Sequence, residues 1–64
     1  MRVNGREYPY RDGLTLHVLL SELQVNSQAV VVMHGNDIYR AGRIPDAPVA
    51  VQDTIEVVTM MQGG

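Results

Sequence analysis

The 64-residue chain contains no cysteine, no tryptophan and no lysine. Without cysteine, disulfide bonds and thiolate metal sites are excluded, so a domain of this size must be stabilised by one apolar core. Hydrophobic residues make up 45% of the chain, which is enough to build such a core. Without lysine, no side-chain amine can be joined to the C-terminus of another copy, which excludes lysine-linked chains of this protein.

Long apolar runs and an excess of positive charge are also missing. No stretch is long enough to cross a bilayer and no charged leader precedes an apolar segment, so we expect a cytoplasmic protein with no membrane partner. The formal net charge is −2 and the five arginines are scattered, which argues against a nucleic-acid partner. We expect the protein to be a monomer when it is alone.

Side chains suited to catalysis or metal binding are scarce. His17 falls on the polar side of an expected helix and His34 in an expected turn, whereas a metal site needs them close together with a third ligand. Neither Ser21 nor Ser27 has a nucleophile-elbow or triad-like context, and the glycines mark separate turns, not a phosphate-binding loop. We therefore expect no catalytic activity of the chain itself, no metal and no bound cofactor.

Turn signals and apolar runs predict five strands. Asn4-Gly5 is the strongest two-residue hairpin signal, because both residues tolerate positive φ. Pro9 places the return strand at a sheet edge, because proline cannot donate to a strand ladder. The expected strands are 2–3, 6–11, 29–33, 38–40 and 54–59.

A stripe of leucines with helical spacing follows Thr15, which is a plausible N-cap. The stripe consists of Leu16, Leu19, Leu20 and Leu23. We expect a helix of about nine residues, too short to be stable alone in water, which must therefore dock on the sheet. Asn26 is a candidate for the left-handed residue at its exit.

This order of elements predicts an α+β fold with the first and last strands adjacent at the centre of a mixed sheet. The sheet would have four to five strands, and the helix would cross one face. This is the β-grasp, or ubiquitin-like, architecture. We expect it to span residues 1–61 and to continue into a flexible tail, residues 62–64.

The Gly63-Gly64 pair at the C-terminus is the feature that most strongly suggests a function. Glycine has no Cβ, so this segment could enter a narrow active site and present its α-carboxylate without steric hindrance. As shown above, no serine or histidine stands in a context typical of a catalytic site. If the protein takes part in a reaction, we expect the reacting group to be the carboxylate of Gly64.

The last strand alternates in a way that suggests a docking surface next to this carboxylate. If Ile55 and Val57 meet the leucine stripe, then Val58 and Met60 face outward from the sheet. Exposed apolar side chains beside a reactive end suggest a partner-binding patch, and methionine makes an adaptable contact there. The candidate partner-binding residues are Val58, Met60, Met61, Gln62 and Gly63.

Segments along the whole chain match one known family. They are Ile44-Pro45-Asp46, 52–58 and 61–64, with Val3-Asn4-Gly5 and the leucine-rich helix as further matches. On these residues the chain resembles the ThiS-type sulfur carriers of thiamin biosynthesis, within the wider ThiS and MoaD group of ubiquitin-like proteins. The resemblance covers essentially the full length.

Three positions depart from the family's pattern. Gln52 stands where a glycine is frequent, so the turn before the last strand is expected to avoid positive φ. Val18 replaces the glutamate of a capping box, and His34 stands where asparagine is frequent. We expect these changes to affect local stability and not the carrier role, which depends on the C-terminal residues.

The resemblance implies a mechanism for the Gly64 carboxylate. An E1-like adenylyltransferase of the ThiF type would bind the C-terminal residues and use ATP and magnesium to adenylate Gly64. Sulfur from a donor such as a cysteine desulfurase system would then replace AMP and leave a thiocarboxylate. Thiazole synthase, of the ThiG type, would take this sulfur, and the carrier would regain its carboxylate. The chain would be a protein co-substrate.

The sequence leaves other functions open. A MoaD-like carrier, or a carrier for an amino-acid pathway, would keep this chemistry and serve another client. A ubiquitin-like modifier would form isopeptide bonds with target proteins. A plain β-grasp binding module would carry the glycines incidentally, so that removing them would leave partner binding unchanged.

Overall fold

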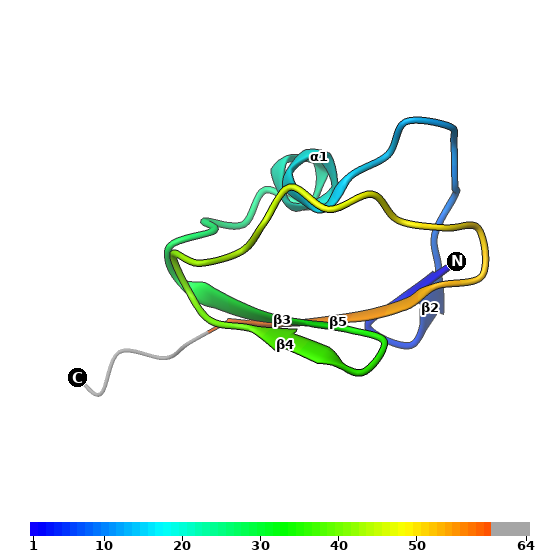
Figure 1. Ribbon diagram of the computed structural model, residues 1–64. Helices are drawn as coiled ribbons and strands as arrows, with labels where there is room; N and C mark the ends of the chain where they lie inside the picture. The colour runs from blue at the N-terminus through cyan, green and yellow to red at the C-terminus, as the bar shows by residue number, and fades with distance from the viewer. Residues whose placement is uncertain (60–64) are drawn as a thin grey trace.

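The computed structural model describes residues 1–59, which form two layers: a five-stranded sheet and a helix (Figure 1). The elements are β1 (Arg2–Val3), β2 (Arg6–Glu7), α1 (Leu16–Glu22), β3 (Val30–His34), β4 (Asp37–Tyr39) and β5 (Thr54–Thr59). Both the helix and the segment 40–53 lie on the same side of the sheet (Figure 1). Within residues 1–59, no helix has the length and apolar character needed to cross a membrane.

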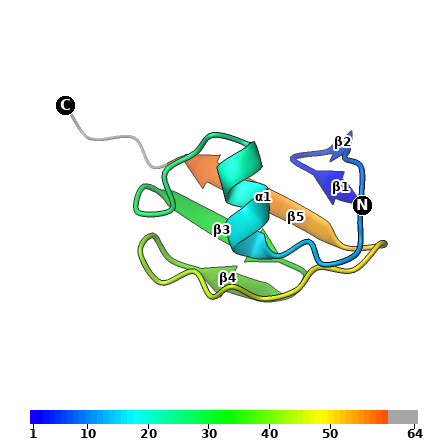
Figure 2. The same cartoon turned by 90° about the horizontal axis from the view of Figure 1, so that it is seen from above.

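The sheet has the strand order β2-β1-β5-β3-β4, which places β5 at its centre (Figure 2). β1 runs parallel to β5, and every other neighbouring pair is antiparallel. The predicted adjacency of the first and last strands is therefore confirmed, and so is the β-grasp fold. Because β1 ends at Val3, beside Ile55, only the beginning of β5 has a strand on both sides.

Apolar side chains from both layers form one core. Most of the predicted leucine stripe is buried, with Leu23 partly buried at its margin. The buried cluster consists of Met1, Val3, Leu14, Leu16, Leu19, Leu20, Val30, Val32, Ile44, Val49 and Ile55. Full burial of one such side chain contributes roughly 1.5–3 kcal/mol, so docking of α1 on the sheet supplies the stability that a short helix lacks.

The helix begins as predicted but ends differently. The Thr15 hydroxyl accepts a hydrogen bond from the Val18 amide at 3.3 Å, which confirms the N-cap. At the other end Gln24, with φ 60, takes the left-handed position. The amide of Gln24 donates to the Ser21 carbonyl and the amide of Val25 donates to the Leu20 carbonyl. This is the pattern of a Schellman motif. The helix therefore has 7 residues instead of the predicted nine or so.

The prediction that Asn26 takes the left-handed position is wrong. The Asn26 side chain instead accepts a hydrogen bond from the Gln28 amide at 2.8 Å, within the turn that leads to β3. A short polar side chain that bonds to the backbone two residues ahead stabilises a turn, so this asparagine serves the connection after the helix and not its cap.

The segment after β2 leaves the sheet earlier than predicted. The expected return strand covered residues 6–11, but β2 ends at Glu7, and Pro9 has no amide with which to continue a ladder. The Tyr8 hydroxyl donates to Glu22 at 2.6 Å, and Arg11 pairs with the same carboxylate. These contacts tie the segment to the helix, and the Arg11 guanidinium is the main reason that the pKa of Glu22 is lowered.

Candidate functional site

Of the predicted site residues, only Val58 lies within the part of the chain that the structure describes. Met60, Met61, Gln62, Gly63 and Gly64 lie outside the described residues, as does the predicted tail, so the expectations for them stay predictions. The site can therefore be built from β5, which leads into these residues, and from the side chains around it.

The side chains of β5 alternate between the core and the outer face of the sheet. Ile55 is fully buried and Val57 packs partly buried against the core, whereas Val58 is 47% exposed. The predicted outward orientation of Val58 is thus confirmed. Its antiparallel neighbour is Val31, which shares the outer face because Val30 and Val32 are buried on the inner one.

Four apolar side chains meet on this outer face, and we call them the outer patch: Val31, Met33, Ile38 and Val58. The register joins them, since Val31 lies opposite Val58 and Met33 lies opposite Ile38. Ile38 is 67% exposed. Neither the helix nor the segment 40–53 covers them, because both lie on the other side of the sheet (Figure 1). An apolar surface therefore adjoins the strand that leads to the C-terminal residues.

Asn4 supports β5 at the point where its parallel neighbour ends. The Asn4 amide donates to the Ile55 carbonyl at 2.9 Å, and the chain then turns through positive φ at Asn4 and Gly5. The Asn4 Oδ1 atom accepts a hydrogen bond from the Val57 amide at 2.7 Å. A strand neighbour would supply a backbone carbonyl there, so the carboxamide extends the ladder by one bond after β1 has turned away. Sequence reasoning identified Asn4 only as a turn residue.

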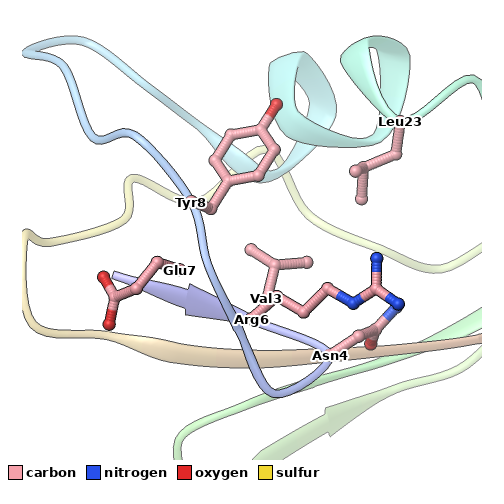
Figure 3. Close-up of a pocket in the computed structure, with 6 residues that line it drawn as sticks. All are labelled: Val3, Asn4, Arg6, Glu7, Tyr8 and Leu23. Atoms are coloured by element: carbon pink, nitrogen blue, oxygen red, sulfur yellow. The ribbon is translucent and has the colours of Figure 1, made fainter.

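A hollow of about 430 Å³ lies beside Asn4, between the β1–β2 hairpin and the end of α1 (Figure 3). Val3 and Leu23 form its apolar part. The Arg6 side chain extends next to Asn4, whereas Glu7 points away from it (Figure 3). Because Val3 and Leu23 belong to the core layer, this hollow lies on the helix side of the sheet and is separate from the outer patch.

The start of β5 is fixed by a histidine–aspartate pair that the sequence did not reveal. The Asp53 Oδ2 atom accepts hydrogen bonds from His34 Nε2 at 2.6 Å and from the Ala50 amide at 2.8 Å. The bond from His34 is the main reason that the pKa of Asp53 lies below its usual value. Gln52 does not adopt positive φ, as expected for the turn without glycine.

The histidines serve structural contacts. His17 Nε2 donates to the Ile44 carbonyl at 2.7 Å, so it links the helix to the segment 40–53. Within residues 1–59, no three side chains of His, Cys, Asp or Glu gather in a way that could hold a metal ion. The titratable groups described above stabilise the helix and the turn before β5.

Comparison with known proteins relates the whole sequence to one family. The model of the ThiS family matches residues 1–64. The "Sulfur carrier protein ThiS" of Thermus thermophilus is 36% identical over 62 residues, which cover 97% of this chain and 95% of that protein. A protein of Trieres chinensis described as "Uncharacterized protein ycf40" is 32% identical over 62 residues, 97% of this chain and 85% of that protein. The family match includes the residues that follow β5.

Proposed function

The chain belongs to the ThiS family of sulfur carriers, and we propose that it carries sulfur as a thiocarboxylate at Gly64 for thiamin (thiazole) biosynthesis. The observation that supports this most directly is the position of β5. The strand lies at the centre of the sheet and leads, in sequence, into Met60-Met61-Gln62-Gly63-Gly64. A partner that binds the outer face of β5 therefore contacts the strand that precedes these residues in the sequence.

The chemistry requires activation because a carboxylate is a poor electrophile. An E1-like adenylyltransferase of the ThiF type joins AMP from ATP to the Gly64 carboxylate, with magnesium held by that enzyme and pyrophosphate released. The terminal sulfur of a persulfide donor, such as a cysteine desulfurase system, then attacks the Gly64 carbonyl carbon as AMP departs. A thiol cleaves the resulting acyl disulfide, so that the thiocarboxylate is released and the donor and the thiol leave as a disulfide. Thiazole synthase of the ThiG type consumes the thiocarboxylate and returns the carrier with its carboxylate.

This chain contributes a scaffold and a docking surface to the reaction. The buried side of β5 anchors the strand, and the outer patch gives a partner an apolar contact beginning at Val58. The thin Gly63-Gly64 segment is suited to a narrow enzyme channel. In this role the protein is a co-substrate of the enzymes that load and unload it.

The loading step is tested by the mass of the intact protein. The full chain is incubated with a ThiF-type enzyme, ATP, magnesium, a persulfide sulfur donor and a thiol reductant. We expect its mass to rise by the difference between sulfur and oxygen, with the change located at Gly64 by fragmentation. The control is the chain without Gly64, which should fold and gain no sulfur. An unchanged mass with an enzyme that loads its own carrier would contradict the proposal.

The client is tested separately from the loading. The thiocarboxylate form is offered to thiazole synthase and to the large subunit of molybdopterin synthase, and loss of sulfur from Gly64 is followed by mass. We expect transfer to occur with thiazole synthase. Transfer with the molybdopterin enzyme alone would assign the chain a MoaD-like role, and conjugates that survive denaturing gels would indicate a protein modifier.

A further inference from the structure

Two exposed arginines line one hollow at the β4 edge of the sheet. The hollow measures about 560 Å³ and is lined by Ile38, Tyr39, Arg40 and Arg43. Arg2 and Arg11 have carboxylate partners, but the ion pairs within residues 1–59 include neither Arg40 nor Arg43. The hollow therefore concentrates positive charge on a chain whose net charge is −2.

The backbone holds these two arginines in a fixed turn. The Arg43 amide donates to the Arg40 carbonyl at 2.9 Å, and the Gly42 amide donates to the Ser27 carbonyl at 3.0 Å. Gly42 has φ 76, and a Cβ there would lie 2.8 Å from Gln28 Oε1. These hydrogen bonds join the turn to the segment before β3. They fix the backbone from which the two arginine side chains extend.

The hollow lies at the end of the sheet where β5 ends. Tyr39 lies beside Val32, and Val32 lies beside Val57, so β4 ends level with the second half of β5. Figure 2 shows the turn after β4 and the end of β5 at the same end of the sheet. The hollow is also continuous with the outer patch, because Ile38 belongs to both.

We propose that Arg40 and Arg43 bind an acidic segment of the enzyme that adenylates Gly64, and that this contact orients the carrier for loading. The inference rests on the proposed function. Guanidinium groups bind carboxylates through paired hydrogen bonds, and each of these two arginines can take such a partner. The exposed Ile38 adds an apolar contact, and the outer edge of β4 has backbone groups without a strand neighbour in the sheet.

A protein partner suits the hollow better than a nucleic acid. Binding to nucleic acid depends on many cations along a phosphate backbone, whereas this acidic chain offers two in one place. Complementary charges at an interface speed encounter and fix orientation. Because β5 ends at this end of the sheet and leads in sequence to Gly64, acidic side chains of an enzyme that binds the end of β5 would come within reach of the arginines.

The test compares loading kinetics of the full chain and a charge-reversed variant. In the double variant Arg40→Glu, Arg43→Glu we expect the KM for loading by the ThiF-type enzyme to rise about tenfold or more at low salt, with kcat little changed. The KM of the unaltered chain should rise with salt more steeply than that of the variant. Arg6→Glu is the matched control, because Arg6 lines the hollow of Figure 3, on the helix side of the sheet. The KM of this variant should stay within about twofold of that of the unaltered chain.

The outcomes separate this inference from the function on which it rests. If the unaltered chain takes up no sulfur, the proposed function fails and the inference fails with it. If the chain loads but the double variant keeps its KM and salt dependence, only the inference is overturned. The variant Arg40→Gln, Arg43→Gln guards against misfolding of the charge-reversed protein and should show a smaller rise in KM.

Further results would also overturn the inference. If the glutamine variant self-associates while loading normally, the arginines serve to keep the β4 edge from pairing with other copies. If the KM rises for thiazole synthase and not for the adenylating enzyme, the acidic partner is misassigned. Binding of a duplex DNA probe that competes with loading would replace the protein partner by a nucleic acid.

Discussion

The beginning and the end of β5 are held in different ways. At Ile55 the strand lies between β1 and β3, and the side chain is fully buried. At Val58 its strand neighbour is β3 alone, and the side chain is 47% exposed. The Asn4 carboxamide marks the boundary between these parts. It accepts a hydrogen bond from the Val57 amide, and no later described residue of β5 is bonded from the side of β1.

This difference shows how one strand can serve both stability and presentation. A strand rises about 3.3 Å per residue, so the change from two strand neighbours at Ile55 to one at Val58 takes only about 10 Å. The two strand neighbours at the beginning fix the direction of the strand, and the side without a strand neighbour at the end leaves room for a partner. Neither property requires a separate element, which suits a domain of this size.

The largest effect is expected where β5 begins. Ile55→Ala removes a fully buried side chain and should lower the free energy of unfolding by about 2–5 kcal/mol. That is a large part of the roughly 3–10 kcal/mol available to such a domain. Urea denaturation followed by circular dichroism measures the loss. Val58→Ala is the control and should cost less than about 1 kcal/mol; equal losses at the two positions would remove the contrast.

The opposite end should matter more for binding than for stability. Val58→Asp places a charge in the outer patch and should raise the KM for loading by the ThiF-type enzyme about tenfold, because the partner must then bury a carboxylate. Its free energy of unfolding should change by less than about 1 kcal/mol. Thr54→Asp is the matched control, an exposed position at the beginning of β5. A similar KM for both variants would contradict a docking role for Val58.

The boundary itself can be weakened at Asn4. Asn4→Gly keeps the positive φ of the turn but removes the acceptor for the Val57 amide, which should cost about 1 kcal/mol. Hydrogen exchange measured by NMR should quicken at Val57 more than at Ile55. Asn4→Asp, which keeps an acceptor oxygen, should restore slow exchange. Unchanged protection of Val57 in the glycine variant would show that the carboxamide does not hold the strand.

The smallest effect is expected from the pair that precedes β5, and it depends on pH. The pKa of Asp53 lies below its ordinary value, chiefly because of the hydrogen bond from His34. A carboxyl group with a lower pKa in the folded state adds stability above its unfolded pKa of about 3.9, and this stability is lost as pH falls through the folded value. The free energy of unfolding of the Asp53→Asn variant, measured by urea denaturation, should therefore change less between about pH 5 and 2 than that of the unaltered chain. Parallel pH profiles of the two proteins would contradict this.

Much of the fold follows from local patterns. The leucine spacing, the Asn4-Gly5 turn and the alternation in β5 each depend on neighbouring residues, and each predicted the correct element. The helix exit was missed because glutamine is an uncommon residue in the left-handed position that Gln24 occupies. The predicted strand 6–11 was too long because Tyr8 and Arg11 bond to Glu22 of the helix. The local sequence pattern of residues 6–11 does not show these contacts.

The candidate site divides in the same way. The outward orientation of Val58 could be predicted, because alternation along a strand is a local property. The bond from Val57 to Asn4 joins residues 53 positions apart, and the pair of His34 with Asp53 spans 19. Such contacts require the register of the sheet, which the sequence does not display. The hollow lined by Arg40 and Arg43 could not be predicted either, because the sequence does not show which arginines form ion pairs.

The central position of β5 also governs when the protein can assemble. The β1–β2 and β3–β4 hairpins do not touch each other in the sheet, and β5 lies between them. A nascent polypeptide whose β5 is still inside the ribosome has two unjoined hairpins and a helix with nothing complete to dock on. Pairing between distant parts of a chain is slow to form. Under the proposed function, an enzyme can therefore recognise the folded carrier only after translation has delivered β5, and unfinished polypeptides would not compete for loading.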